Sequence, residues 1–239
     1  MMTRLLNRLT AKFSRMASGF QTDSGDILHY ARVSAAMSSA HYYSQNMLTV
    51  PNFPTDLALL QFALQAAQVD DGLICEFGVA SGRTINWIAK HAGHRRIHGF
   101  DSFEGLPEDW RTGFSEGSFK RIEPPRHAAN VDLHIGRFEV TLPPFRAEYS
   151  GPLAFLHVDC DLYSSTKTIL SHLADRIVPG TIIVFDEYLN YPGWENGEHG
   201  AWKEHCAAHG TTYEYLGFVS RHQQVAVRVL TTGEASSSR

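Results

Sequence analysis

Residues 73–82 read Leu-Ile-Cys-Glu-Phe-Gly-Val-Ala-Ser-Gly, and this stretch decides the fold. The apolar run Leu73–Phe77 is typical of a short buried strand, and the glycines and serine that come next predict a tight turn. The following residues, Thr84–His91, read as a helix. A strand, a tight turn and a helix in this order form the opening unit of a parallel sheet.

The same pattern recurs along the chain. A helix predicted at Thr55–Gln68 precedes the first strand, and another is predicted at Ser164–Ile177. Four further strands, each leading into turn residues or a carboxylate, are predicted at Arg96–Phe100, Val131–Ile135, Leu153–Val158 and Thr181–Phe185. The last of these is rich in β-branched residues, which places it in the middle of a sheet that is covered on both faces.

The end of the chain departs from this alternation. Thr212–Val219 and Gln224–Leu230 both read as strands, with only the short segment Ser220–Gln223 between them. Such a pair predicts an antiparallel hairpin. The predicted fold class is therefore α/β, with a Rossmann-like, doubly wound and mostly parallel sheet that a C-terminal antiparallel hairpin completes.

The chain has 239 residues, of which 43% are hydrophobic, and this suffices for one sizeable core. We expect an N-terminal helical segment at 1–50 that acts as a lid or dimer contact, one α/β domain at 51–230, and a disordered tail at 231–239. Within the first segment, Met1–Ser18 has the pattern of a basic amphipathic helix. A surface or homodimer contact is the first interpretation, and attachment to a membrane surface or organelle targeting stays open.

The net charge and the cysteines limit which partners and which cellular location are expected. A formal net charge of -4 argues against a nucleic-acid partner held through its phosphates, so a small-molecule substrate fits better. No apolar run reaches the roughly 20 residues that a transmembrane helix needs. The three cysteines are odd in number and lack the paired spacing of a zinc or disulfide framework. We therefore expect a cytoplasmic protein.

The turn after the first strand indicates what kind of ligand binds. Gly78 and Gly82 have the spacing G-x-x-x-G, whereas a pyrophosphate is typically seated by G-x-G-x-x-G. Glu76 would repel a pyrophosphate but suits a cationic ammonium or sulfonium ligand. Asp101 ends the second strand 25 positions later (101 minus 76), near the spacing at which an acid accepts hydrogen bonds from ribose hydroxyls. Together these residues predict a site for a phosphate-free, cationic nucleoside.

Carboxylates follow two later strands. Asp159 and Asp161 come after the fourth strand, and Asp186 and Glu187 come after the fifth. We interpret Asp159, Asp186 and Glu187 as oxygen ligands for a divalent cation, most plausibly Mg²⁺. The alternative is that these acids are paired with arginines or solvated. Asp161 either caps the helix that begins near Ser164 or takes part in the chemistry.

A metal at this place suits methyl transfer to oxygen, because a bound cation lowers the pKa of a substrate hydroxyl and orients it. A nearby group must then accept the proton. Asp159 and Asp161 are the carboxylate candidates, and His157, His199 and His205 are the histidines within reach along the chain. The long irregular segment 107–130 is predicted to be a substrate lid or an insertion.

Two motifs carry a resemblance to a known family. Residues 100–107 read Phe-Asp-Ser-Phe-Glu-Gly-Leu-Pro, and residues 157–166 read His-Val-Asp-Cys-Asp-Leu-Tyr-Ser-Ser-Thr. These motifs resemble the macrocin and mycinamicin O-methyltransferase family of class I enzymes, which methylate sugar hydroxyls on macrolides. The resemblance runs from about Met47 to Leu230, and it implies that 51–230 is a class I methyltransferase domain using S-adenosylmethionine and a divalent metal.

The resemblance also implies roles for individual residues. The implied cofactor contacts are Glu76, Gly78, Ser81, Asp101 and Ser102, together with Gly136, Arg137 and Phe138 in the region that flanks the adenine. The implied metal ligands are Asp159, Asp186 and Glu187, and Glu187 stands where the family tends to have Asp. The N-terminal segment and the segment 110–130 match no part of the family, and these are the parts expected to select the substrate.

The function predicted from the sequence is therefore an O-methyltransferase that acts on a hydroxyl of a sugar or a related small molecule. A nicotinamide-dependent oxidoreductase is one alternative, which the glycine spacing and Glu76 disfavour. A non-catalytic, methyltransferase-like binding protein is another, and the complete set of strand-end acids argues against it.

Overall fold

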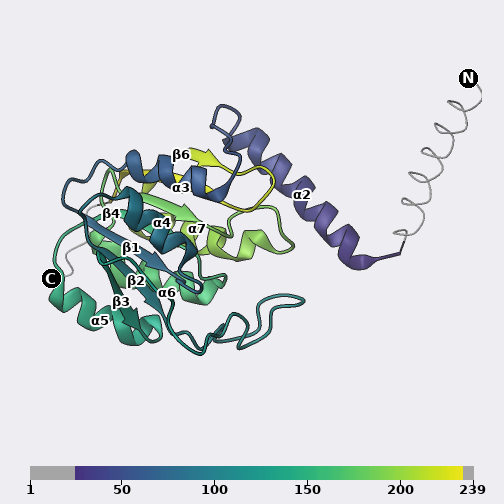
Figure 1. The fold of residues 1–239 in the computed structure, drawn as a ribbon. Helices are drawn as coiled ribbons and strands as arrows, with labels where there is room; N and C mark the ends of the chain where they lie inside the picture. The colour runs from purple at the N-terminus through teal and green to yellow at the C-terminus, as the bar shows by residue number, and fades with distance from the viewer. Residues whose placement is uncertain (1–24, 234–239) are drawn as a thin grey trace, which may run out of the picture.

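The computed structural model describes residues 25–233, which fold around a seven-stranded sheet with the strand order β3-β2-β1-β4-β5-β7-β6 (Figure 1). The strands are β1 (Leu73–Phe77), β2 (Ile97–Asp101), β3 (Val131–Ile135), β4 (Leu153–Val158), β5 (Ile182–Phe185), β6 (Thr212–Phe218) and β7 (Val225–Thr231). The first five strands pair in parallel, and β7 pairs antiparallel with both β5 and β6. The predicted fold class and the C-terminal hairpin are confirmed.

Helices cover both faces of the sheet. The helices of the described residues are α2 (Ile27–Asn46), α3 (Asp56–Gln65), α4 (Arg83–His91), α5 (Phe138–Glu148), α6 (Tyr163–Leu173) and α7 (Glu198–His209). Helices α3 and α4 contact each other, while α6 contacts both α5 and α7. In β5, Ile182 and Val184 join one buried cluster, and Ile183 and Phe185 join the other. Successive strand residues point to opposite faces, so β5 has a core on each side, as its composition predicts.

Two helices were not foreseen from the sequence. Helix α5 contains Pro143 and Pro144, which usually indicate a loop because proline lacks an amide donor and clashes with the preceding turn. Helix α7 contains three histidines and a glycine and shows little separation of polar and apolar faces. The predicted helix Ser164–Ile177 is α6 followed by a short 3-10 turn at Ala174–Arg176.

Helix α2 extends from one side of the sheet domain, and its C-terminal part is joined to that domain (Figure 1). The Tyr42 and Tyr215 hydroxyls are 2.5 Å apart, and Trp194 Nε1 donates to Ser38 Oγ at 2.8 Å. The predicted helix Met1–Ser18 and most of the predicted tail lie outside the described residues. Within residues 25–233 no helix has both the length and the apolar character needed to cross a membrane.

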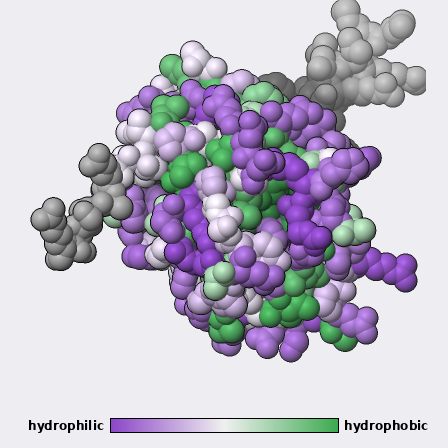
Figure 2. Space-filling model, turned by 90° about the vertical axis from the view of Figure 1, so that its left-hand side faces the viewer, coloured by the Kyte–Doolittle hydropathy of each residue, from purple (hydrophilic) through white to green (hydrophobic). Residues whose placement is uncertain are grey.

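The exterior is mainly polar, because the apolar faces of the sheet are covered by helices on both sides. On the face in Figure 2 hydrophilic side chains cover most of the surface, and hydrophobic ones form smaller patches among them. The fold thus leaves the carboxyl ends of the parallel strands as the place where polar side chains converge.

Candidate active site

The turns after β1, β4 and β5 are tied together by backbone hydrogen bonds. Gly78 N donates to Phe100 O, Asp159 N donates to Phe77 O, and Asp186 N donates to Val158 O, each at 2.9 Å. Each bond continues the ladder one step past the end of a strand. The residues predicted to act at separate strand ends are therefore placed side by side on one edge of the sheet.

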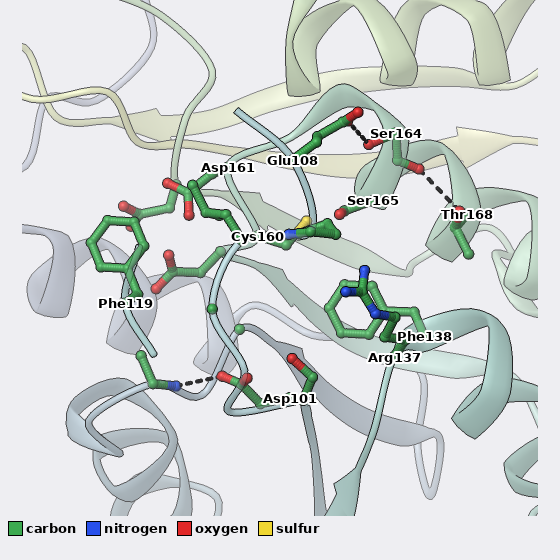
Figure 3. Close-up of a pocket in the computed structure, with 18 of the residues that line it drawn as sticks. Asp101, Glu108, Phe119, Arg137, Phe138, Cys160, Asp161, Ser164, Ser165 and Thr168 are labelled. Carbon is green, nitrogen blue, oxygen red and sulfur yellow. Dashed lines mark hydrogen bonds between the residues drawn. The ribbon is translucent and has the colours of Figure 1, made fainter. Parts of the chain in front are cut away.

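A cavity of about 720 Å³ opens on this edge. The predicted site residues that line it are Gly78, Asp101, Ser102, Gly136, Arg137, Phe138, Asp159, Asp161, Asp186 and Glu187. Asp161 lies on one side of the cavity, and Arg137 and Phe138 lie on another (Figure 3). The structure thus brings the predicted nucleoside residues and the predicted acids into one space.

Two predicted cofactor residues do not line this cavity. The side chain of Ser81 is exposed, and that of Glu76 is completely buried beneath the strand ends. Glu76 Oε1 accepts a hydrogen bond from Thr84 Oγ1 at 3.1 Å, and Glu76 Oε2 lies 2.9 Å from His157 Nδ1. Glu76 therefore does not face the cavity, where a cationic ligand would bind, because its carboxylate is engaged inside the protein.

The glycine turn has a steric basis. Gly78 adopts φ +96°, and a Cβ added there would overlap the carbonyl oxygen of Asp159. Any other residue would therefore be both strained and too large. Asp101 fixes the same turn, because its carboxylate accepts hydrogen bonds from Ala80 N at 2.8 Å and from Phe103 N at 2.7 Å. Asp101 also lines the cavity, and each carboxylate oxygen can accept more than one hydrogen bond.

The acids after β4 and β5 form an electronegative cluster. Burial, followed by the charges of Asp186 and Glu76, raises the pKa of Asp159 well above its ordinary value. Burial and the charges of Asp186 and Glu198 do the same to the pKa of Glu187. Like charges in a low-dielectric setting disfavour ionisation of each neighbour. Such a cluster favours the binding of a cation.

Asp186 and Glu187 are held by residues that the sequence did not reveal. Gln224 Nε2 donates to both carboxylate oxygens of Asp186 at 3.1 Å. Glu187 N donates to Glu198 Oε2 at 3.0 Å, and Glu198 is itself fully buried. Glu198 begins α7, so the failure to predict that helix also hid this carboxylate.

Asp161 does not cap a helix. Helix α6 has Leu162 at its N-cap position and no side-chain capping bond, whereas Asp161 adopts φ +65° and its side chain lines the cavity. Burial, and then the charge of Asp186, raises the pKa of Asp161 to about 7. The capping interpretation is therefore wrong, and the position of Asp161 fits a group that exchanges protons.

The three histidines considered as bases have different surroundings. His199 packs against Tyr42, Tyr188 and Trp194, and His205 stacks on Trp202; neither lines the cavity. Burial lowers the pKa of both to about 4. His157 is different, because one atom each of His157, Asp159 and Asp186 lie within 4.8 Å of one another. Glu187, a predicted metal ligand, lines the cavity but is outside this group.

The irregular segment 107–130 forms one wall. Its Glu108 accepts a hydrogen bond from Ser164 Oγ at 2.5 Å, and its half-exposed Phe119 lines the cavity (Figure 3). Arg111 lies 3.8 Å from the ring centroid of Trp110. An apolar ring on a cavity wall limits the access of water to that wall. Arg83 also lines the cavity, and its place directly after Gly82 gave no recognisable signal.

Comparison with known proteins identifies first the class of fold. The structure of the calicheamicin methyltransferase CalS11 matches with a TM-score of 0.59 and 25% identity, over 72% of this chain and 78% of that chain. The O-methyltransferase NovP matches with a TM-score of 0.56 and 21% identity, over 73% and 79%. The chain has the Rossmann-like α/β fold of methyltransferases.

Sequence comparison then shows what the chain is similar to. Residues 75–188 match the model of a protein family described as "Methyltransferase domain". A Streptomyces olivaceus protein, named 8-demethyl-8-(2,3-dimethoxy-alpha-L-rhamnosyl)-tetracenomycin-C 4'-O-methyltransferase, is 28% identical over 155 residues. That match covers 54% of this chain and 58% of the relative, so the similarity spans little more than half of either protein.

Proposed function

We propose that this chain is an S-adenosylmethionine-dependent O-methyltransferase that acts on a hydroxyl of a sugar or a related small molecule, assisted by a divalent metal. One observation carries the proposal: a single cavity contains both Asp101 on its glycine turn and the acids Asp159, Asp161 and Asp186. The whole of this arrangement lies inside the match to a methyltransferase domain.

The cavity fits the cofactor in its shape and its polar groups. Asp101 offers carboxylate lone pairs for ribose hydroxyls, and Gly78 and Gly136 leave backbone exposed to the ligand. Phe138 and Arg137 provide planar groups that could flank an adenine. When bound, S-adenosylmethionine supplies a methyl group on a sulfonium, which an oxygen nucleophile displaces in line.

The acids fit a divalent cation, because Asp159 and Asp186 lie close together and a further carboxylate, that of Glu187, is buried beside them. Glu187 Oε2 is buried without a hydrogen-bond partner among the described residues. When bound, such a cation lowers the pKa of a hydroxyl. Asp161 then stands where a carboxylate can accept the hydroxyl proton. The lid residues Glu108 and Phe119 would close the cavity against water.

The substrate class rests on the relatives and on the cavity. The Streptomyces olivaceus relative is named for methylating a rhamnosyl group, and CalS11 is named for calicheamicin. Ser164, Ser165 and Thr168 of α6 place hydroxyls on one wall, which suits the hydrogen-bonding pattern of a sugar. The three free and buried cysteines support a cytoplasmic location.

Two measurements test the function. Calorimetric titration with S-adenosylmethionine and with NAD should give binding of the first only, and binding of NAD alone would favour the oxidoreductase alternative. Incubation with S-adenosylmethionine and a panel of rhamnosides should yield products heavier by one CH₂ in mass spectrometry. Cofactor binding without methylation of any sugar or polyol would support the non-catalytic alternative.

We also propose that α2 forms a homodimer contact. Its side chains Ile27, Tyr30 and Met37 are 79%, 54% and 69% exposed, and their spacing places them along one side of the helix. Burying such side chains against a second copy would remove apolar area from water. Sedimentation analysis should report a dimer that Met37→Glu weakens; an unchanged monomer would refute this contact.

A further inference from the structure

We propose that His157 is itself a ligand of the metal, through Nε2, so that the ion is held by His157, Asp159 and Asp186 and a first-row transition ion such as Mn²⁺ or Co²⁺ is preferred over Mg²⁺. This inference rests on the metal part of the proposed function. It changes the expected donor set from oxygen alone to nitrogen and oxygen.

The strand geometry brings the three residues together. His157 and Asp159 are two positions apart at the end of β4, and side chains two apart on a strand point to the same face. Phe185 pairs with Val158, so Asp186 follows directly beside Asp159. His157 Nε2 lies 4.0 Å from Asp186 Oδ1, and the three ligand atoms lie within 4.8 Å of one another.

The other side of the imidazole is fixed by Glu76. Glu76 pairs with His157 across β1 and β4, and its Oε2 is 2.9 Å from His157 Nδ1. Because an ionised carboxylate only accepts, Nδ1 carries a hydrogen and Nε2 is directed to the acids. Histidine ligands typically donate their second ring N–H to a carboxylate in this way, which fixes the tautomer.

Nε2 lacks a partner in the protein. The His157 side chain is 0% exposed, and Nε2 has no hydrogen bond within the described residues. A distance of 4.0 Å to Asp186 is too long for a hydrogen bond. Two ligand atoms that share one ion through bonds of about 2.1 Å can be up to about 4.2 Å apart, so the separation suits an intervening ion. An unsatisfied buried nitrogen facing two carboxylates is otherwise costly.

The donor set decides which ions are preferred. Mg²⁺ prefers an octahedron of oxygen ligands, many of them water, whereas imidazole suits later divalent ions. One nitrogen and two carboxylates therefore favour a transition ion. The alternative is a structural role, in which His157 is an imidazolium that bridges Glu76 and Asp186 and binds no metal.

Pulsed electron paramagnetic resonance separates the two roles. Untagged full-length protein, stripped with a chelator and loaded with Mn²⁺ in a nitrogen-free buffer, should show electron spin-echo modulation from a directly bound ¹⁴N. Calorimetry should show Mn²⁺ binding at least about tenfold tighter than Mg²⁺. Tightly bound Mn²⁺ without nitrogen coupling, or no Mn²⁺ binding at all, would overturn the proposal. The wild-type spectrum decides this even if no variant folds.

Variants give graded outcomes. His157→Gln should remove the nitrogen signal and weaken Mn²⁺ binding at least tenfold, and Glu76→Gln should keep the signal while weakening binding by roughly 10-fold. The matched control is His98→Asn, which alters another buried histidine, on β2, and should change neither the signal nor the affinity. Retention of nitrogen coupling in His157→Gln would overturn the assignment.

The resonance and calorimetry results do not depend on the proposed enzymatic activity, because the samples contain neither cofactor nor methyl acceptor. Nitrogen-coupled Mn²⁺ in a protein that transfers no methyl group would refute the proposed function and leave His157 as a ligand. Methyl transfer by a protein whose bound Mn²⁺ shows no nitrogen coupling would refute only the role of His157.

Discussion

The two halves of the cavity are built in opposite ways. Around β1 and β2, Asp101 has both carboxylate oxygens engaged by backbone amides, so its charge is compensated within the protein. Around β4 and β5, burial, followed by the charges of neighbouring acids, raises the pKa of Asp159 and of Glu187. His157 Nε2 has no hydrogen-bond partner among the described residues. The acid of the first half is engaged by the protein itself, while a cation, as proposed above, would compensate the acids of the second. We infer that the half around β1 and β2 has its final geometry before the cofactor binds. The half around β4 and β5 would be stabilised most by a bound cation.

The largest effect is expected where the two halves of the cavity touch, at the contact between Gly78 and Asp159. Gly78→Ala should destabilise the fold by at least about 4 kcal/mol, because the added methyl group meets the Asp159 carbonyl and the left-handed backbone is strained. Chemical denaturation measures the loss. Gly93→Ala is the matched control, since Gly93 has φ +67° with nothing within 4 Å, and it should cost only about 1 kcal/mol. Equal costs would mean that the halves are not rigidly joined.

The next largest effect should separate metal from cofactor. Asp186→Ala should lower metal-stimulated turnover by at least about 100-fold, or roughly 3 kcal/mol of transition-state stabilisation, while S-adenosylmethionine affinity stays within a few fold. Steady-state kinetics and calorimetry on the same preparation test this. Asp175→Ala, which alters an exposed acid of an ion pair, is the control. Full wild-type activity in EDTA would show that the acids do not act through a metal.

A smaller effect is expected in the other half. Asp101→Ala should weaken S-adenosylmethionine binding by about 1–3 kcal/mol, because the cofactor hydroxyls and two turn amides lose their acceptor. Metal affinity should be unchanged. Asp132→Ala is the control on the adjacent strand, where Asp132 pairs with Arg96 at the surface. If Asp101→Ala binds the cofactor as tightly as the wild type, Asp101 has no part in the site.

The smallest effect concerns His98, a buried histidine that stays neutral at neutral pH. Burial, followed by the charge of His134, lowers the pKa of His98 to about 4. The unfolded chain binds a proton near pH 6.5, so stability should be full above that pH and decline as the pH falls towards 4. His98→Asn should flatten the loss of unfolding free energy between pH 7 and pH 5 by about 1–2 kcal/mol. Urea titrations of both proteins at pH 7 and pH 5 measure the unfolding free energy. An equal loss in the wild type and in His98→Asn would contradict this prediction.

The same two halves differ in how far the sequence predicts them. Strands such as Thr181–Phe185 could be predicted because a fully buried parallel strand has a distinctive apolar composition. The residues after each strand could be placed together because parallel strands end at one edge of the sheet. For this reason the sequence alone indicates that Asp101, Asp159, Asp161 and Asp186 lie near one another.

The remainder depends on contacts between distant residues. The partnership of Glu76 with His157 joins positions 81 residues apart and follows from strand register, which a single sequence does not state. Glu198 and Gln224 support the acids from a helix without clear periodicity and from the start of a hairpin strand. Glu76 was therefore predicted to contact the cofactor, when its carboxylate lies beneath the cavity.

The close packing of Gly78 on Asp159 also has a consequence for turnover. Strand ends that leave no room for one methyl group cannot open and close with each catalytic cycle, so the sheet edge must behave as a fixed floor. If the segment 107–130 is the lid that its sequence predicts, movement that admits substrate must occur there. Its side-chain hydrogen bond to α6 joins Ser164 to Glu108, and Asn86 of α4 holds its other end at Arg126 and Ala128. We expect the end of the segment near Glu108, rather than the end bonded to Asn86, to move when the cavity opens.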